Sequence, residues 1–379
     1  MPEFYVEPMK DRQSCFVCKK TVTGKKWLLT CIKCHAITYC GVECQGADWP
    51  RHEWNCVPVM VTEVPGKGRG LVAGRDIEKG DLIFKDDPVI KLAINDKGLP
   101  VDPEFMTSLK QQIESLPAEA KSQYYKLSNR ADANTWSRND NAVLKLFLSP
   151  SKVYQVYHEG KENDEYSLLH LNLALVNHSC APNATNSGIP RKQEGVEDLR
   201  NELRAIKNIS KGEEITICYF MDVKKFGSIP RKMKTDIAIS LGFNCECPVC
   251  LGQVPGQEKT LKKLIEVHNK LKHNPSDWKR ESGLWSRIVD LIMELYIGHT
   301  FEKISALESL AGFAHLARDK ALVRKAMDML KQFAEELKIE AIQRSFEVRE
   351  RNLAQWSKEF SSNNAPERRE IEFFMNPDI

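Results

Sequence analysis

The chain has 379 residues, of which 42% are hydrophobic and 28% charged, and its formal net charge is +3. This length and composition are typical of a soluble protein with two or three domains. Nearly balanced charge gives no general reason to bind nucleic acid, and no run reaches the ~18 apolar residues that span a bilayer. The first residues lack the apolar core of a signal peptide, so we expect a cytoplasmic location, a nuclear location or both.

The amino-terminal region holds most of the cysteines, at spacings that indicate metal rather than disulfides in a reducing compartment. A Cys-x2-Cys pair directs two sulfurs at one ion from a tight turn, and an x3 spacing places two ligands on one face of a helical turn. We therefore expect Cys40 with Cys44, and His52 with Cys56, on helical turns. Eight ligands, enough for two tetrahedral zinc ions, are Cys15, Cys18, Cys31, Cys34, Cys40, Cys44, His52 and Cys56.

The middle of the chain alternates short strand-like runs with turns. Residues 66–84, GKGRGLVAGRDIEKGDLIF, predict two strands around the turn EKGD, and residues 202–220 predict two strands around a second glycine turn. Residues 101–165 are polar and mixed in pattern, with helical stretches such as 117–128, and are interpreted as an insertion of low information. The apolar run 167–176 leads into the motif NHSCAPN at 177–183. These patterns predict a β-rich region.

Three closely spaced thiols further along, Cys245, Cys247 and Cys250, make an incomplete tetrahedral metal site. The fourth ligand must come from a distance, and Cys180 and Cys218 are the candidates. The sequence favours Cys180 only mildly, because Cys218 lies in the strand-like run ITICYF, where thiols are common core residues.

Beyond the polar segment 252–259 the pattern changes to helix. Apolar positions recur on one helical face in two stretches, namely Leu261, Leu264, Ile265, His268 and Leu271, and then Leu284, Ile288, Leu291, Ile292 and Leu295. On this stripe His268 is expected to pack against apolar neighbours rather than to bind metal. The expected fold class is therefore an α+β multidomain protein with a zinc-bound finger, a β-rich middle and an all-α carboxyl-terminal region.

The cysteine pattern, together with Tyr39 and the run ADWPRHEWNC, resembles the MYND zinc finger. Four elements in order, GKGRGL, NHSCAPN, GEEITICY and CECPVC, resemble the SET domain of protein lysine methyltransferases and its cysteine-rich post-SET tail. The chain is thus identified as a member of the SET and MYND domain-containing (SMYD) family. The expected domains are a finger at 12–57, a SET domain at 60–222 with an insertion at about 100–165, a post-SET zinc segment at 223–251 and a helical domain at 258–379.

The resemblance implies S-adenosylmethionine (SAM) and three structural zinc ions as cofactors. Its implied cofactor contacts are Lys67, Gly68, Arg69, Asn177, His178, Tyr219 and Phe243, with the Tyr219 hydroxyl at the point of methyl transfer. Its implied zinc ligands are Cys15, Cys18, Cys40 and Cys44 for one ion, Cys31, Cys34, His52 and Cys56 for the second, and Cys180, Cys245, Cys247 and Cys250 for the third. The implied activity is SAM-dependent N-methylation of lysine in a histone or another protein.

Two departures from the family pattern qualify this expectation. In better-known members the finger interrupts the SET domain, whereas here it precedes it, an arrangement similar to that of an invertebrate branch. Leu241 stands where many relatives carry a channel-lining tyrosine. The alternative is a catalytically weak or inactive adaptor whose finger binds proline-containing peptides, acting as a transcriptional corepressor. We expect a monomeric chromatin regulator with no membrane or nucleic-acid partner.

Overall fold

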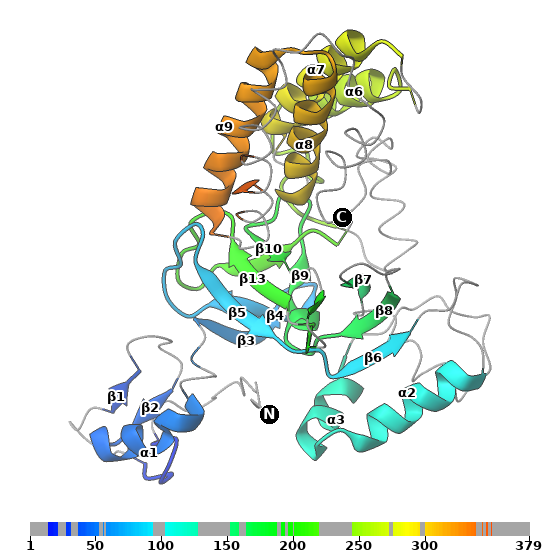
Figure 1. The fold of residues 1–379 in the computed structure, drawn as a ribbon. Helices are drawn as coiled ribbons and strands as arrows, with labels where there is room; N and C mark the ends of the chain where they lie inside the picture. Colours follow the sequence, from blue (N-terminus) through cyan, green and yellow to red (C-terminus); the bar gives the residue numbers. More distant parts are fainter. Residues whose placement is uncertain are drawn as a thin grey trace. The chain divides into compact units, whose positions relative to one another are not determined.

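The computed structural model describes residues 14–21, 28–31, 37–52, 56, 58–93, 103–127, 152–158, 164–187, 191–193, 196–199, 201–219, 245–272, 276–295, 300–338, 343, 346–347 and 350. They fall into two compact units (Figure 1). The first unit comprises residues 1–158, 163–177 and 186–217, and the second comprises residues 159–162, 178–185 and 218–379. Among the described helices, none has the length and apolar character needed to cross a membrane.

The finger contains a two-stranded antiparallel sheet, β1 (Leu29–Thr30) and β2 (Thr38–Tyr39), followed by helix α1 (Val42–His52). Its small core consists of the buried residues Cys15, Cys31, Tyr39 and Cys56. The buried Tyr39 hydroxyl donates a hydrogen bond to Asp48 Oδ2 at 2.8 Å and so joins β2 to α1. A core in which cysteine predominates is too small to hold a fold by apolar burial alone.

Three sheets form the β-rich part of the chain. Their strand orders are β3-β4-β14-β9, β10-β13-β5 and β12-β11-β7-β8-β6. The strands are β3 (Val59–Val64), β4 (Gly68–Ala73), β5 (Leu82–Asp86), β6 (Ile90–Ala93), β7 (Lys152–His158), β8 (Asp164–Leu169), β9 (Asn177–His178), β10 (Ala184–Ser187), β11 (Arg191–Gln193), β12 (Val196–Asp198), β13 (Asn201–Ala205) and β14 (Glu214–Ile217).

A tight turn between β3 and β4 explains the first glycines of GKGRGL. The Lys67 amide donates a hydrogen bond to the Val64 carbonyl at 3.0 Å. Pro65 and Gly66, which has a φ of +73°, occupy the central positions. Proline followed by a glycine with positive φ is typical of a type II turn. The turn places Lys67 immediately before β4.

The described part of the insertion contains two helices, and the second lies within the helical stretch expected at 117–128. Helices α2 (Pro103–Ser115) and α3 (Ala118–Tyr125) contribute Leu109, Ile113 and Tyr124, all nearly inaccessible to solvent. These side chains share one hydrophobic cluster with residues of β6 and β8, including Ile90 and Leu169. The insertion helices therefore form part of the core of the first unit.

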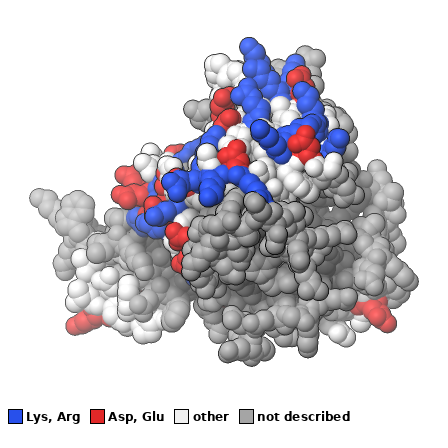
Figure 2. Space-filling view, turned by 45° about the horizontal axis from the view of Figure 1, so that its top comes forward, with Lys and Arg blue, Asp and Glu red and all other residues white. Residues whose placement is uncertain are grey.

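Four described helices follow in the second unit, namely α6 (Gln257–His268), α7 (Trp278–Glu294), α8 (Thr300–Leu316) and α9 (Lys320–Leu337) (Figure 1). Asp277 and Asp319 cap α7 and α9 by accepting hydrogen bonds from backbone amides of the first turn. Each helix packs on the next along the chain. Figure 2 shows Lys and Arg interspersed with Asp and Glu over the described part of the visible face.

Candidate functional site

The structure brings together two groups of finger residues that could hold zinc. The Sγ atoms of Cys15, Cys18, Cys40 and Cys44 lie within 4.8 Å of one another. The second group consists of Cys31, His52 and Cys56, whose ligand atoms meet the same limit. Cys34 lies outside the described residues. All of the described ligands lie in the finger, whose other described residues include few buried side chains.

The helical placement expected for the finger ligands differs from that observed. Cys44 and His52 lie near opposite ends of α1, whereas Cys40 precedes this helix and Cys56 follows it. The helix starts only after Gly41, whose carbonyl accepts a hydrogen bond from the Gln45 amide at 3.2 Å. One helix thus carries one ligand of each group, which ties the two groups together.

A third group lies in the second unit and joins the NHSCAPN motif to the cysteine tail. Its members, all buried, are Cys180, Cys245, Cys247 and Cys250. Cys218 is buried but does not belong to this group. Side-chain hydrogen bonds within the group lower the pKa of the Cys245 and Cys247 thiols and raise that of Cys180, so the first two favour thiolate, the form that binds metal.

The sulfur separations fit zinc. A tetrahedral ion with Zn–S bonds of ~2.3 Å places its sulfurs about 3.8 Å apart. The observed distances are 4.0 Å from Cys180 to Cys245 and 3.6 Å from Cys180 to Cys250. In the finger, Cys18 and Cys44 each lie 3.5 Å from Cys40. Disulfides need ~2.05 Å, so these groups are ligand sets, and the zinc prediction agrees with the geometry.

His178 links the third thiol group to Tyr219. Its Nδ1 atom accepts a hydrogen bond from the Tyr219 backbone N–H at 3.0 Å, so the ring proton lies on Nε2. Nε2 is 3.3 Å from Cys180 Sγ, where it can donate to a metal-bound thiolate. The His178 and Tyr219 ring centroids are 5.3 Å apart. The imidazole therefore connects the Tyr219 backbone to the third thiol group.

Glu214 joins Lys67 and Asn177, two of the predicted cofactor residues of the first unit. One of its carboxylate oxygens pairs with Lys67 Nζ at 2.6 Å, and the other accepts from Asn177 Nδ2 at 3.0 Å. Asn177 Nδ2 is also 3.3 Å from the Arg69 carbonyl. Strand β14 thus ties the glycine-rich turn to the start of NHSCAPN. Sequence reasoning missed Glu214, although a carboxylate opening an apolar strand was a usable signal.

Arg69 connects the glycine-rich strand to the insertion. Its guanidinium donates a hydrogen bond to the Lys126 carbonyl, which follows the last turn of α3. A cation at a helix carboxyl end is favoured by the helix dipole. In this structure the side chain of Arg69 positions the insertion, and its backbone carbonyl faces Asn177.

Leu241 and Phe243 lie outside the described residues.

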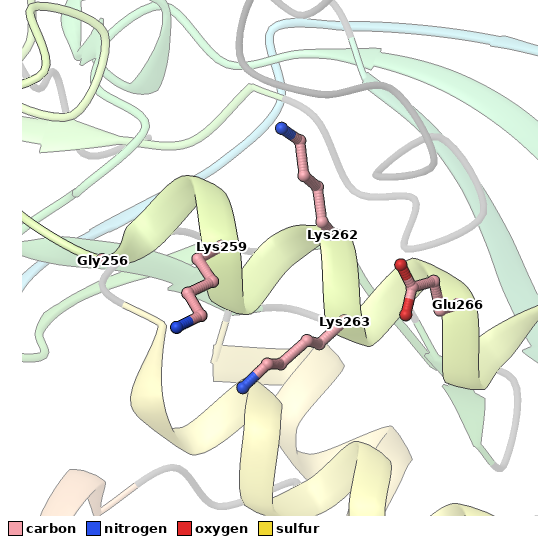
Figure 3. A pocket seen from close by; sticks show the side chains of 5 residues that line it. All are labelled: Gly256, Lys259, Lys262, Lys263 and Glu266. Carbon is pink, nitrogen blue, oxygen red and sulfur yellow. The ribbon is translucent and has the colours of Figure 1, made fainter.

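A hollow of about 580 Å³ lies beside α6 and is lined by Gly256, Lys259, Lys262, Lys263 and Glu266 (Figure 3). Lys262 extends away from Lys259 and Lys263, so the three ammonium groups do not converge. None of the predicted cofactor or zinc residues lines it. This arrangement gives no reason to place the reaction here.

Comparison with known proteins identifies two domains, which contain the finger ligands and most of the predicted cofactor residues. Residues 15–56 match the MYND finger, and residues 68–220 match the SET domain. Human histone-lysine N-methyltransferase SMYD3 is 27% identical over 293 residues, covering 71% of this chain and 60% of that protein. Human N-lysine methyltransferase SMYD2 is 30% identical over 244 residues, covering 62% of this chain and 50% of that protein.

Human histone-lysine N-methyltransferase SMYD1 is 25% identical over 313 residues, covering 74% of this chain and 58% of that protein. The chain thus spans between half and three-fifths of the length of these relatives. The two domain matches share one chain, with the finger first. The chain therefore contains a MYND finger followed by a SET domain, and it is similar to SET and MYND domain-containing proteins.

Proposed function

We propose that this protein is a SAM-dependent protein-lysine N-methyltransferase. The observation that carries the proposal is the position of Tyr219, which ends the GEEITICY segment of the SET match and is bound through its backbone by His178. The methyltransferase activities named for human SMYD2 and SMYD3 support the same reaction here. The proposed substrate is a lysine of a histone or another protein.

The proposed reaction is an in-line displacement. Bound SAM supplies a methyl group on a positively charged sulfur. The neutral lysine amine forms the new carbon–nitrogen bond as the carbon–sulfur bond breaks, and the amine proton passes to solvent. Such chemistry depends on positioning at near-attack distance. Binding and orientation are assigned to Lys67, Gly68, Arg69, Asn177, His178, Tyr219 and Phe243.

The Tyr219→Phe substitution tests this proposal. Removing the hydroxyl is expected to lower methyl transfer about 100-fold or more, because a donor aimed at the reacting centre contributes about that much. SAM affinity and zinc content should stay near wild type, because the backbone bond to His178 remains. The measurement is transfer of labelled methyl from SAM to proteins of a cell extract.

Tyr125→Phe is the matched control, because it removes a tyrosine hydroxyl from a side chain that is 50% exposed. The control should transfer methyl at the wild-type rate. Equal labelling by Tyr219→Phe and wild type would remove Tyr219 from the reaction. No labelling by wild type across varied extracts would count against the enzyme itself.

A second candidate function, peptide binding by the finger, is favoured by exposed apolar side chains there. They are Val17, Leu29, Val42 and Trp49, with exposed fractions of 39%, 44%, 72% and 37%. We propose that this surface binds proline-containing peptides, with or without catalysis in the SET domain. If SAM does not bind while the peptide does, the protein is an adaptor of the corepressor kind.

Trp49→Ala is expected to weaken binding of a proline-rich peptide by about tenfold or more, since buried interface tryptophans contribute strongly. Calorimetry with a proline-rich peptide measures this. The control is Leu251→Ala, which removes an apolar side chain that is 53% exposed outside the finger. Equal losses in both variants would contradict a specific role of the finger.

We further propose a cytoplasmic and nuclear distribution, chromatin proteins among the substrates, and a monomeric state. The domain pair and the activities named for the relatives support the second of these. Imaging of the tagged protein and light scattering of the purified chain test the distribution and the monomeric state. Labelling of purified histones tests the substrate.

A further inference from the structure

A buried carboxylate outside the predicted cofactor residues holds the segment that leads into NHSCAPN. Asp86 ends β5 and is 5% exposed. Its Oδ2 atom accepts hydrogen bonds from the backbone amides of Asn172 at 3.0 Å and Leu173 at 2.8 Å, and its Oδ1 accepts from Asn172 Nδ2 at 3.0 Å. Three donors converge on one side chain, as at a helix amino terminus, where an anion is favoured.

The segment held in this way is the short 3-10 helix η1 (Leu173–Leu175). It contacts β4, the strand that follows the glycine-rich turn. Val176, which is fully buried, connects η1 to Asn177. A shift of η1 would therefore move Asn177 relative to Arg69 and Glu214, its two hydrogen-bond partners.

We propose that ionised Asp86 is a positioning residue for SAM, fixing η1 so that Asn177 and the glycine-rich strand keep the spacing that the cofactor requires. This inference rests on the proposed function. A neutral side chain cannot replace the carboxylate, because an amide presents an NH2 group to at least one of the three donors, and a protonated acid presents an O–H.

The charge of Asp86 changes near neutral pH. Burial raises its pKa to about 7, although the hydrogen bonds from Leu173 and Asn172 oppose the rise. Burial also lowers the pKa of His170 to about 4, so this imidazole stays neutral above pH 6. Other described charged or titratable groups lie on the same elements or beside them. On β5 and β13, Lys85 and Arg204 both pair with Glu202. Asp87 follows β5, and His170 precedes η1.

The sign of the pH effect follows from these groups. As the pH falls through 7, Asp86 takes up a proton and one acceptor oxygen becomes a donor. Lys85, Glu202 and Arg204 are already paired, so Asp86 is the group whose charge changes. If only the ionised form binds SAM, the apparent Kd at pH 6 is about tenfold higher than at pH 8.5, because about one molecule in ten is then competent.

The experiment measures SAM binding by calorimetry at pH 6 and pH 8.5 for wild type, Asp86→Asn and Asp87→Asn. Asp87 is the adjacent, exposed acid and serves as the matched control. Wild type and Asp87→Asn should both bind SAM more weakly at pH 6 than at pH 8.5. Asp86→Asn should bind SAM weakly at both pH values, with the same Kd at each.

Wild-type affinity of Asp86→Asn at pH 8.5, or an unchanged pH slope in that variant, would overturn the inference while leaving the proposed function intact. If no protein binds SAM at any pH, the proposed function and the inference fail together. If Asp86→Asn does not fold, Asn172→Ala replaces it. Losing the Nδ2 donor should move the pH midpoint of SAM binding upward, and an unmoved midpoint would overturn the inference.

Discussion

A Cys180→Ser protein is expected to bind two zinc ions instead of three and to lose about 10- to 100-fold in SAM affinity. A serine hydroxyl is not ionised at neutral pH and is a poor zinc ligand, so the buried site opens. His178 then loses the Cys180 sulfur, 3.3 Å from its Nε2 atom, and its hold on Tyr219 loosens. Metal analysis and calorimetry provide the two measurements.

Cys218→Ser is the control for this experiment, because it makes the same change at a buried cysteine outside the thiol groups. It should keep three zinc ions and lose ~1–3 kcal/mol of stability, the cost of an extra buried polar group. A Cys180→Ser protein with three zinc ions and full SAM affinity would show that the motif and the cysteine tail are independent.

The sequence was most informative where the chemistry is local. Ligand spacings such as Cys15-x2-Cys18 and Cys247-x2-Cys250 are set by a few residues of backbone, so they predict metal without knowledge of the fold. The predicted turn EKGD has the same local character, and there the Asp81 amide donates a hydrogen bond to the Glu78 carbonyl at 3.0 Å. The fourth ligand of the third site was left open by spacing alone, because Cys180 and Cys245 meet only through tertiary structure.

The rest depended on contacts between distant segments. Asp86 accepts hydrogen bonds from Asn172, and Glu214 accepts them from Lys67 and Asn177, and no local pattern pairs these residues. Their partners are fixed by strand register and by the path of the chain between strands. The helical pattern at 117–128 is local and was predicted, but the packing of Tyr124 with residues of β6 and β8 is not visible in that pattern.

The Gly70→Ala protein is expected to bind SAM more weakly and to lose about 100-fold in the rate of methyl transfer, the effect of a misplacement of ~1 Å in a positioned site. A Cβ atom at Gly70 would lie 2.6 Å from Asn177 Nδ2 and 2.7 Å from Val64 Cγ2, distances that force a shift. Val64 belongs to the strand paired with β4. Asn177 donates hydrogen bonds to the Arg69 carbonyl and to Glu214. The added methyl group must therefore break those hydrogen bonds or bend β4.

Gly283→Ala is the matched control, because its Cβ would meet nothing within 4 Å and it lies inside α7. There alanine should raise stability by up to ~1 kcal/mol through its better helix propensity and should leave SAM binding unchanged. In Gly70→Ala the free energy of unfolding should in addition fall by ~1–3 kcal/mol, the usual cost of overpacking. If Gly70→Ala instead binds SAM as tightly as Gly283→Ala, the close approach of Asn177 to β4 does not determine cofactor affinity.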